Sequence, residues 1–257
     1  MEMRAEARAS GGRTLAFRIV GWLFGVATIG LYIPFVVVAF VTDDPAQTVH
    51  RFHVVGAFAG LALIGVFSIV FVLRPTWTAA WHVLVAQALA YLFGGLMGGD
   101  LISGFWITGA VGVAILGVLA PDRRSLLRLP GRPSVALLTY ALLCAIPVWI
   151  YAVTNAELQR LGSPTDPHVE LHHWSGVAVA ALAIAGAGLA ASLRGEGWRF
   201  AAAATAIAAV AFGVAGLIFA ESPGAPPSDA WSWLVIAAGI GFWLLARIEA
   251  AREAPAP

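Results

Sequence analysis

The sequence predicts an all-α integral membrane protein with eight transmembrane helices arranged as two tandem four-helix repeats. Of its 257 residues, 60% are hydrophobic and only 11% are charged, whereas a soluble domain carries roughly 25% charged residues. Apolar segments of about 20 residues, the length that crosses a bilayer core, follow one another along the chain. Matching motifs in its two halves indicate the repeat.

Eight spans can be drawn from hydropathy and from the turn residues between them. They lie at about 15–41, 49–73, 77–98, 101–120, 134–154, 168–193, 199–220 and 230–247. A basic, proline-containing connector separates the fourth span from the fifth. We therefore expect a first four-helix half at residues 1–120, a cytoplasmic connector at 121–133 and a second four-helix half at 134–257.

The basic residues predict the orientation in the membrane, because cytoplasmic loops carry an excess of arginine and lysine. All fifteen basic residues are arginine. With the N-terminus in the cytoplasm, only Arg51 and Arg160 lie on the outer side. The others then face the cytoplasm: Arg4, Arg8, Arg13, Arg18, Arg74, Arg123, Arg124, Arg128, Arg132, Arg194, Arg199, Arg247 and Arg252. We expect a multi-pass protein of the cell (plasma) membrane with both termini in the cytoplasm.

Similar motifs recur at equivalent points of the two halves. Each second span follows an Asp-Pro pair, which combines a helix N-cap with proline at the first helical position. Four spans per half give both halves the same orientation, related by an axis along the membrane normal. The matched pairs are Ile33-Pro34 with Ile146-Pro147, Asp44-Pro45 with Asp166-Pro167, Leu73-Arg74 with Leu193-Arg194, and Asp100 with Asp229.

Five of the six histidines form two clusters at the outer mouths of the second and sixth spans. Residues three or four apart share a helix face. We therefore expect His50 and His53 to point together, and His168 and His172 to do the same, with His173 turned by about 100°. The axis that relates the halves would bring the two clusters together near the outer face.

Imidazole is a good ligand for haem iron, zinc and copper. We predict a haem b bound by His53 and His173, with His50, His172 and His168 as alternates. Such a protein would serve in electron transfer or haem handling. The partners that we expect are the lipid bilayer and a redox partner or other membrane subunits.

The alternative cofactor is a single zinc, copper or iron ion. Its predicted ligand set is His168, His172, His173, Asp100 and Glu170. Asp100, Glu170 and Arg51 are also candidates for outer-shell roles, because a carboxylate holds an imidazole N–H and an arginine holds a haem propionate.

Two further interpretations need no haem. Histidine, tryptophan and arginine are common at the membrane interface, and imidazole titrates near neutral pH. The protein would then be a non-catalytic membrane subunit or a permease with anchoring or proton-sensing histidines. A third class is a membrane metal-dependent hydrolase or oxygenase, so the sequence leaves open whether the protein is an enzyme.

Composition excludes several other functions. Without lysine, the chain cannot form the Schiff base of retinal or of pyridoxal phosphate. Its single cysteine, Cys144, cannot ligate an iron–sulfur cluster or make a C-x-x-C-H haem attachment site. The net charge of +1 gives no basic patch for nucleic acid.

The layout resembles the haem A synthase family. The stretch Val49-His50-Arg51 leads into a span that ends Leu73-Arg74-Pro75, and that family shows a His-Arg pair in the same place. The resemblance implies a histidine-bound haem within the bundle. In that family the ligands come from the second and fourth helices of each half, whereas spans 4 and 8 here contain no histidine, so we expect ligands from spans 2 and 6.

The spacing His168-x3-His172-His173 is similar to one histidine box of membrane di-iron desaturases and hydroxylases. Those enzymes carry about three such boxes, placed toward the cytoplasm, whereas this chain has six histidines, five of them predicted to face out.

Overall fold

The computed structural model describes residues 2–104, 106–126 and 132–253, and all regular structure in this part of the chain is helical. The all-α prediction is confirmed, and seven of the helices in this part of the chain are long and apolar enough to cross a membrane, whereas eight were predicted. The helices are α1 (Glu2–Val41), α2 (Pro45–Thr48), α3 (Arg51–Leu73), α4 (Thr78–Gly98), α5 (Trp106–Leu119), α6 (Arg123–Leu126), α7 (Val135–Leu161), α8 (Pro167–Glu170), α9 (His173–Ser192), α10 (Trp198–Ile218) and α11 (Asp229–Arg252).

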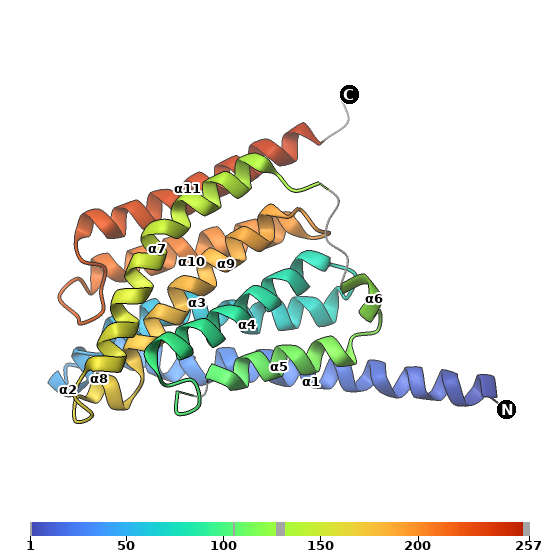
Figure 1. Ribbon diagram of the computed structural model, residues 1–257, viewed down its shortest axis with the longest axis horizontal. Helices are drawn as coiled ribbons and strands as arrows, with labels where there is room; N and C mark the ends of the chain where they lie inside the picture. Colours follow the sequence, from blue (N-terminus) through green and yellow to red (C-terminus); the bar gives the residue numbers. More distant parts are fainter. Residues whose placement is uncertain (1, 105, 127–131, 254–257) are drawn as a thin grey trace.

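The fourth predicted span corresponds to α5, which is shorter than expected. It has 14 residues, or about 21 Å at 1.5 Å per residue, whereas a bilayer core is about 30 Å thick. The difference arises because residues 101–104 form turns after the left-handed Gly99 (φ +75°) that ends α4. In Figure 1, α5 still runs alongside α1 between the same two ends of the bundle.

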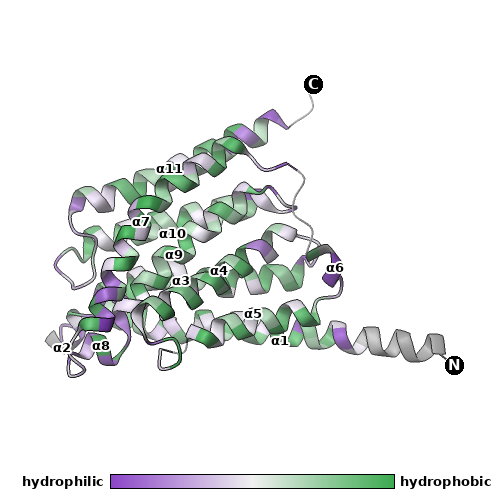
Figure 2. Cartoon of the chain, viewed as in Figure 1, coloured by the Kyte–Doolittle hydropathy of each residue, from purple (hydrophilic) through white to green (hydrophobic). Residues whose placement is uncertain are grey.

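The central helices cross closely. More than half of the apolar window is buried in each of α3, α9 and α10, whereas α1, α7 and α11 expose most of theirs. A Cβ at Gly60 of α3 would lie only 2.3 Å from the carbonyl oxygen of Ala180 in α9, so these two backbones touch. The exposed flanks are hydrophobic along their length (Figure 2), as expected for surfaces that face lipid.

Polar residues collect at the two ends of the bundle (Figure 2). The histidine end comprises α2, α8, the first turns of α3 and α9, and the neighbouring loops. The arginine end lies opposite and contains α6, the start of α1 and the end of α11 (Figure 1). Of the predicted connector, residues 123–126 form α6, and residues 127–131, Arg128 among them, lie outside the described part.

The arginine end is joined by a network of ion pairs. Glu249 of α11 accepts a 2.8 Å hydrogen bond from the Ser134 hydroxyl and lies 3.5 Å from Arg194. Glu253 pairs with Arg194 and, at 3.0 Å, with Arg199. These contacts join the start of α7, the end of α9 and the start of α10 to the end of α11.

Candidate metal centre

The two histidine clusters meet at the histidine end. His50 is the residue that precedes α3, and His53 lies in its first turn. His168 belongs to the short helix α8, and His173 begins α9. The Nδ1 atoms of His50 and His173 are 2.9 Å apart and share a hydrogen bond. The mouths of the second and sixth predicted spans therefore converge.

Three of these histidines could hold a metal ion. His50, His53 and His168 each offer a ring nitrogen, and these atoms all lie within 4.8 Å of one another. Zinc binds imidazole nitrogen at about 2.0–2.1 Å, so the nitrogens of a tetrahedral site stand roughly 3.3 Å apart. Ring shifts of about 1–2 Å would therefore bring the three nitrogens to coordination distance.

Several ring nitrogens in this cluster are buried and lack a hydrogen-bond partner within the described structure. They are both nitrogens of His53, a side chain only 3% exposed, and Nε2 of His168. An unpaired buried polar group destabilises a fold by about 1–3 kcal/mol, so each one requires an explanation. A bound cation would supply the missing partner.

Asp166 orients His168. Its Oδ1 atom accepts the backbone N–H of His168 at 2.9 Å and lies 2.9 Å from that residue's Nδ1. The backbone hydrogen bond, followed by the bond to the ring, holds the pKa of Asp166 below its usual range. A carboxylate that accepts Nδ1–H leaves Nε2 with its lone pair free, which is how metal-binding histidines are commonly held. The sequence alone predicts only a helix-capping role for Asp166.

His173 and Trp174 form a wall of the cluster. The His173 ring stacks on that of His53, with centroids 5.1 Å apart and planes inclined by 21°. Trp174 meets the His53 ring edge to face at 5.0 Å and lies 5.3 Å from the His168 ring. Aromatic surroundings of this kind limit solvent access to a metal site.

The loop between α10 and α11 covers the cluster from another direction. Gly224 has φ +77°, and a Cβ there would lie 2.5 Å from His53 Nε2. Its carbonyl oxygen accepts a hydrogen bond from the Tyr151 hydroxyl. Glycine thus provides both the left-handed backbone and the space for the ring. The role of Gly224 is not predicted from the sequence, where its only signal is its place in a proline-rich loop.

Burial, and after it the neighbouring His168, lower the pKa of His50. His50 is therefore neutral near pH 7, the state that a metal ligand requires. Asp166 contributes a negative charge beside it. The cluster thus presents imidazole nitrogens and one carboxylate, which suits a cation.

His172 does not join the other histidines, and the expectation that it shares a face with His168 is wrong. The predicted continuous helix is broken: α8 ends at Glu170, α9 begins at His173, and His172 between them is left-handed with φ +57°. Its Nδ1 atom lies 2.9 Å from Oδ2 of Asp100.

Asp100 is satisfied by the protein itself. This carboxylate is only 6% exposed. Its Oδ1 accepts hydrogen bonds from Trp106 Nε1 at 3.1 Å and from Ser175 Oγ at 2.9 Å, while Oδ2 faces His172. The structure therefore places Asp100 and His172 in a separate pair that joins the turn after α4 to α9, not in the predicted ligand set.

The remaining predicted residues lie around the edge of the cluster. Glu170 is exposed on α8. Arg51 donates to the carbonyl oxygen of Thr42 at 2.6 Å and lies 3.9 Å from Asp43, so it ties α3 to the end of α1. His82, the sixth histidine, lies in the first turns of α4, which begins at the arginine end.

Comparisons with family models, with curated proteins and with solved structures found no match for this chain. The resemblance to the haem A synthase family therefore stays a prediction, and the function has to be argued from the site.

Proposed function

We propose that this protein is an integral membrane metal-binding protein whose histidine end holds one divalent transition-metal ion, zinc or copper. The observation that carries the proposal is the convergence of His50, His53 and His168, together with buried ring nitrogens of His53 and His168 that have no hydrogen-bond partner within the described structure. Imidazole suits both metals, and the bond from Asp166 prepares His168 for coordination.

The ring contacts favour a single ion over haem. Axial histidines point their ring edges at the iron from opposite sides of the porphyrin. His53 and His173 instead stack face to face, and the rings of His50 and His173 touch through their Nδ1 atoms. Haem b, and with it electron transfer or haem handling, stays a prediction from the sequence.

Three imidazoles leave a fourth tetrahedral position. His173, whose Nδ1 is hydrogen-bonded to that of His50 at 2.9 Å, is the candidate for a fourth ligand, and a four-histidine site would leave no position open for water. Otherwise a water molecule takes that position, as in catalytic zinc sites, where the metal lowers the pKa of the bound water to about 7. In both cases Asp166 fixes the His168 tautomer, and Trp174 and Gly224 limit access of bulk water.

We also propose that the bundle is a tandem repeat with its arginine end in the cytoplasm and its histidine end outside the plasma membrane. Packing supports the repeat, because α1 packs on α3 as α7 packs on α9, and α4 packs on α9 as α10 packs on α3. Both bounds of α4 and α10, and the ends of α1 and α7, are offset by the same 120 residues. Arginine bias supports the orientation.

The test is elemental analysis and metal titration of the full-length protein purified from membranes in mild detergent. We expect about one equivalent of zinc or copper per chain. A His53→Ala, His168→Ala double variant should lose it. His82→Ala is the matched control, because it removes a histidine outside the cluster and should retain the metal. Cobalt substitution would distinguish the two forms of the site, because the d–d spectrum of a four-nitrogen site differs from that of a site with a bound water.

Two results would overturn the proposal. One is protein that neither retains nor takes up zinc or copper when either salt is added alone. The other is a Soret band with stoichiometric iron that disappears in the double variant, which would assign the histidines to haem.

A further inference from the structure

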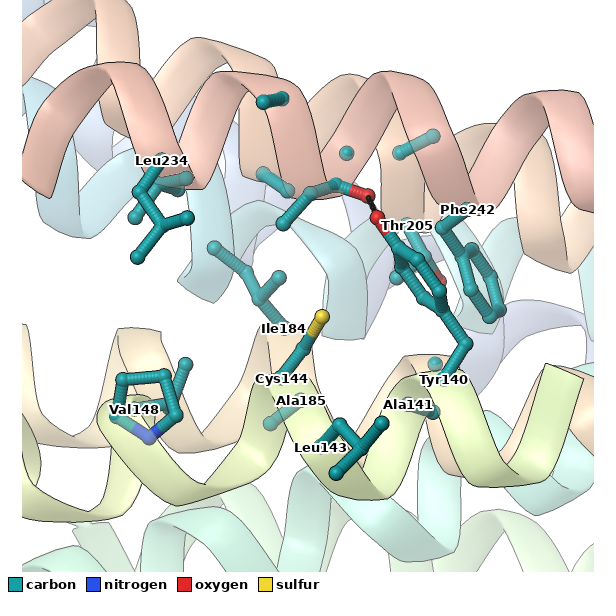
Figure 3. Close-up of a pocket in the computed structure, with 18 of the residues that line it drawn as sticks. Tyr140, Ala141, Leu143, Cys144, Val148, Ile184, Ala185, Thr205, Leu234 and Phe242 are labelled. Atoms are coloured by element: carbon teal, nitrogen blue, oxygen red, sulfur yellow. Dashed lines mark hydrogen bonds between the residues drawn. The ribbon is translucent and has the colours of Figure 1, made fainter.

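An apolar pocket lies among α7, α9, α10 and α11, away from the histidines (Figure 3). Its volume is about 400 Å³, which is within the range of ligand-binding pockets. Tyr140 and Cys144 of α7 face Leu234 and Phe242 of α11 across it, with Ile184 of α9 behind. All four helices are long and apolar enough to span a membrane, so the pocket lies at the depth of the lipid chains.

The hydroxyl groups that line the pocket are already used by the protein. Tyr140 donates to the carbonyl oxygen of Ala238 at 3.2 Å, and Thr205 donates to that of Ala201 at 2.8 Å. Cys144 contributes a thiol, which behaves as a small hydrophobic group. The pocket therefore offers little to a polar molecule, and a hydrocarbon is the occupant that matches its walls.

The pocket is bounded on the lipid side by α7 and α11, two of the helices most exposed to the surroundings. Leu143 and Leu234, which line it, are 62% and 54% exposed. An unfilled apolar space forfeits dispersion contacts, and water finds too few polar partners there to stay. Within a bilayer the neighbouring molecules are acyl chains. We propose that the pocket binds one acyl chain of a membrane phospholipid, inserted between α7 and α11.

A smaller cavity continues from this pocket toward the histidine end. It shares Val148, Ile184 and Trp231 with the pocket and extends to Tyr151. The Tyr151 hydroxyl donates to Gly224, the residue against which His53 packs. The chain therefore enters from the leaflet at the histidine end. The proposal is independent of what the histidines bind.

Photolabelling tests it on the full-length protein in phosphatidylcholine vesicles that contain a phospholipid with a diazirine on its acyl chain. Surrounding lipid labels the exposed Leu143 and Leu234 in any case. A chain inside the pocket also labels Ile184 at its back. Filling the pocket with Ala185→Phe should remove most of the Ile184 label, whereas Ala27→Phe, the same change on the exposed face of α1, should leave it intact.

Ala237→Phe fills the pocket from α11 and gives a second reading should Ala185→Phe fail to fold. Labelling of Leu143 and Leu234 without Ile184 in the native protein overturns the proposal. So does an Ile184 label that both filling variants retain. If excess unlabelled isoprenoid quinone removes the Ile184 label and excess phospholipid does not, the occupant is an isoprenoid chain and the acyl assignment is wrong.

Discussion

The two ends of the bundle treat their polar side chains in opposite ways. At the arginine end, Glu249 and Glu253 of α11 pair with Arg194 and Arg199, which lie at the end of α9 and the start of α10. At the histidine end, imidazole rings pack against one another, and His53 keeps two buried nitrogens without a partner in the described structure. The ion pairs at the arginine end stabilise the fold by themselves. The histidine end leaves ring nitrogens available for the metal ion that we propose.

The comparison distinguishes residues that stabilise the fold from residues that the fold positions. Asp100 and Asp166 make the same point within the histidine end, because each contacts a histidine Nδ1 atom at 2.9 Å. Asp100 receives two further donors and anchors α9. Asp166 holds His168, whose buried Nε2 has no partner within the described residues. Of the two pairs, only the second therefore leaves a ring nitrogen for the metal ion that we propose.

The largest expected effect comes from His53→Leu. It should reduce zinc affinity by more than about 100-fold, since outer-shell changes alone reduce affinity by about 10–100-fold. In the metal-free protein it should raise the free energy of unfolding by about 1–3 kcal/mol, because it removes unpaired buried nitrogens. Isothermal titration and thermal unfolding in detergent measure the two quantities.

Glu249→Gln is the counterpart at the arginine end. It should lower stability by about 1 kcal/mol, because its charged hydrogen bonds weaken while the group stays partly exposed, and it should leave zinc affinity unchanged. If His53→Leu destabilised the metal-free protein as much as Glu249→Gln does, the contrast between the two ends would be lost.

Gly224→Ala should impair both binding and stability. A Cβ would meet His53 Nε2 at 2.5 Å, and the backbone is left-handed, so we expect a loss of about 1–3 kcal/mol and weaker zinc binding. Gly197→Ala is matched to it, because Gly197 has φ +83° and its Cβ would meet the Trp77 ring at 2.6 Å at the arginine end. It should be destabilised similarly and bind zinc normally. Equal zinc affinity in the two variants would contradict the role given to Gly224.

Asp166→Asn should weaken zinc binding by about tenfold, because an amide no longer holds His168 by charge. Glu170→Gln removes a carboxylate from the same short helix, where it is exposed, and should change nothing. Competition titration with a chromogenic chelator measures both. An Asp166→Asn protein with native affinity would show that the carboxylate only caps α8.

Acid should displace His50 from zinc only at a lower pH than it would protonate a free imidazole. The folded-state pKa of His50 lies below its ordinary value of 6.5, so His50 stays neutral until the pH falls below about 6.5. Between the folded-state pKa of His50 and its ordinary value of 6.5, the unfolded chain binds more protons than the folded chain. The free energy of unfolding of the metal-free protein therefore falls as the pH falls through this window. Zinc titrations of the native protein and of His50→Ala at stepped pH should show the contribution of His50 to affinity maintained to about pH 6.5. A contribution that already declines above about pH 7 would contradict it.

Much of the layout could be predicted from the sequence, because hydropathy and arginine placement act over whole helices. The convergence of the two histidine clusters followed from their position at the mouths of equivalent spans. The pairing of His50 and His53 followed from helical spacing, which holds because α3 is regular from Arg51 onward.

The details that depend on distant residues could not be predicted. His172 carries no glycine or proline signal, and its left-handed backbone accompanies a contact with Asp100, 72 positions earlier. Gly224 matters because a loop 171 residues after His53 happens to cover that ring. The sequence explains Asp166 fully as a helix cap that accepts the backbone N–H of His168. Nothing in it indicates the additional contact with the His168 ring.

The close backbone contact between Gly60 and Ala180 is the point about which the crossing angle of α3 and α9 would change. His53 and His173 each lie seven residues before this crossing, so each is about 10 Å from it along its helix. A change of about 10° in crossing angle would alter the separation of the two rings by about 2 Å, comparable to the shift that coordination requires. Tightening the histidines on an ion would therefore also move the opposite ends of α3 and α9, which lie about three to four turns beyond the crossing.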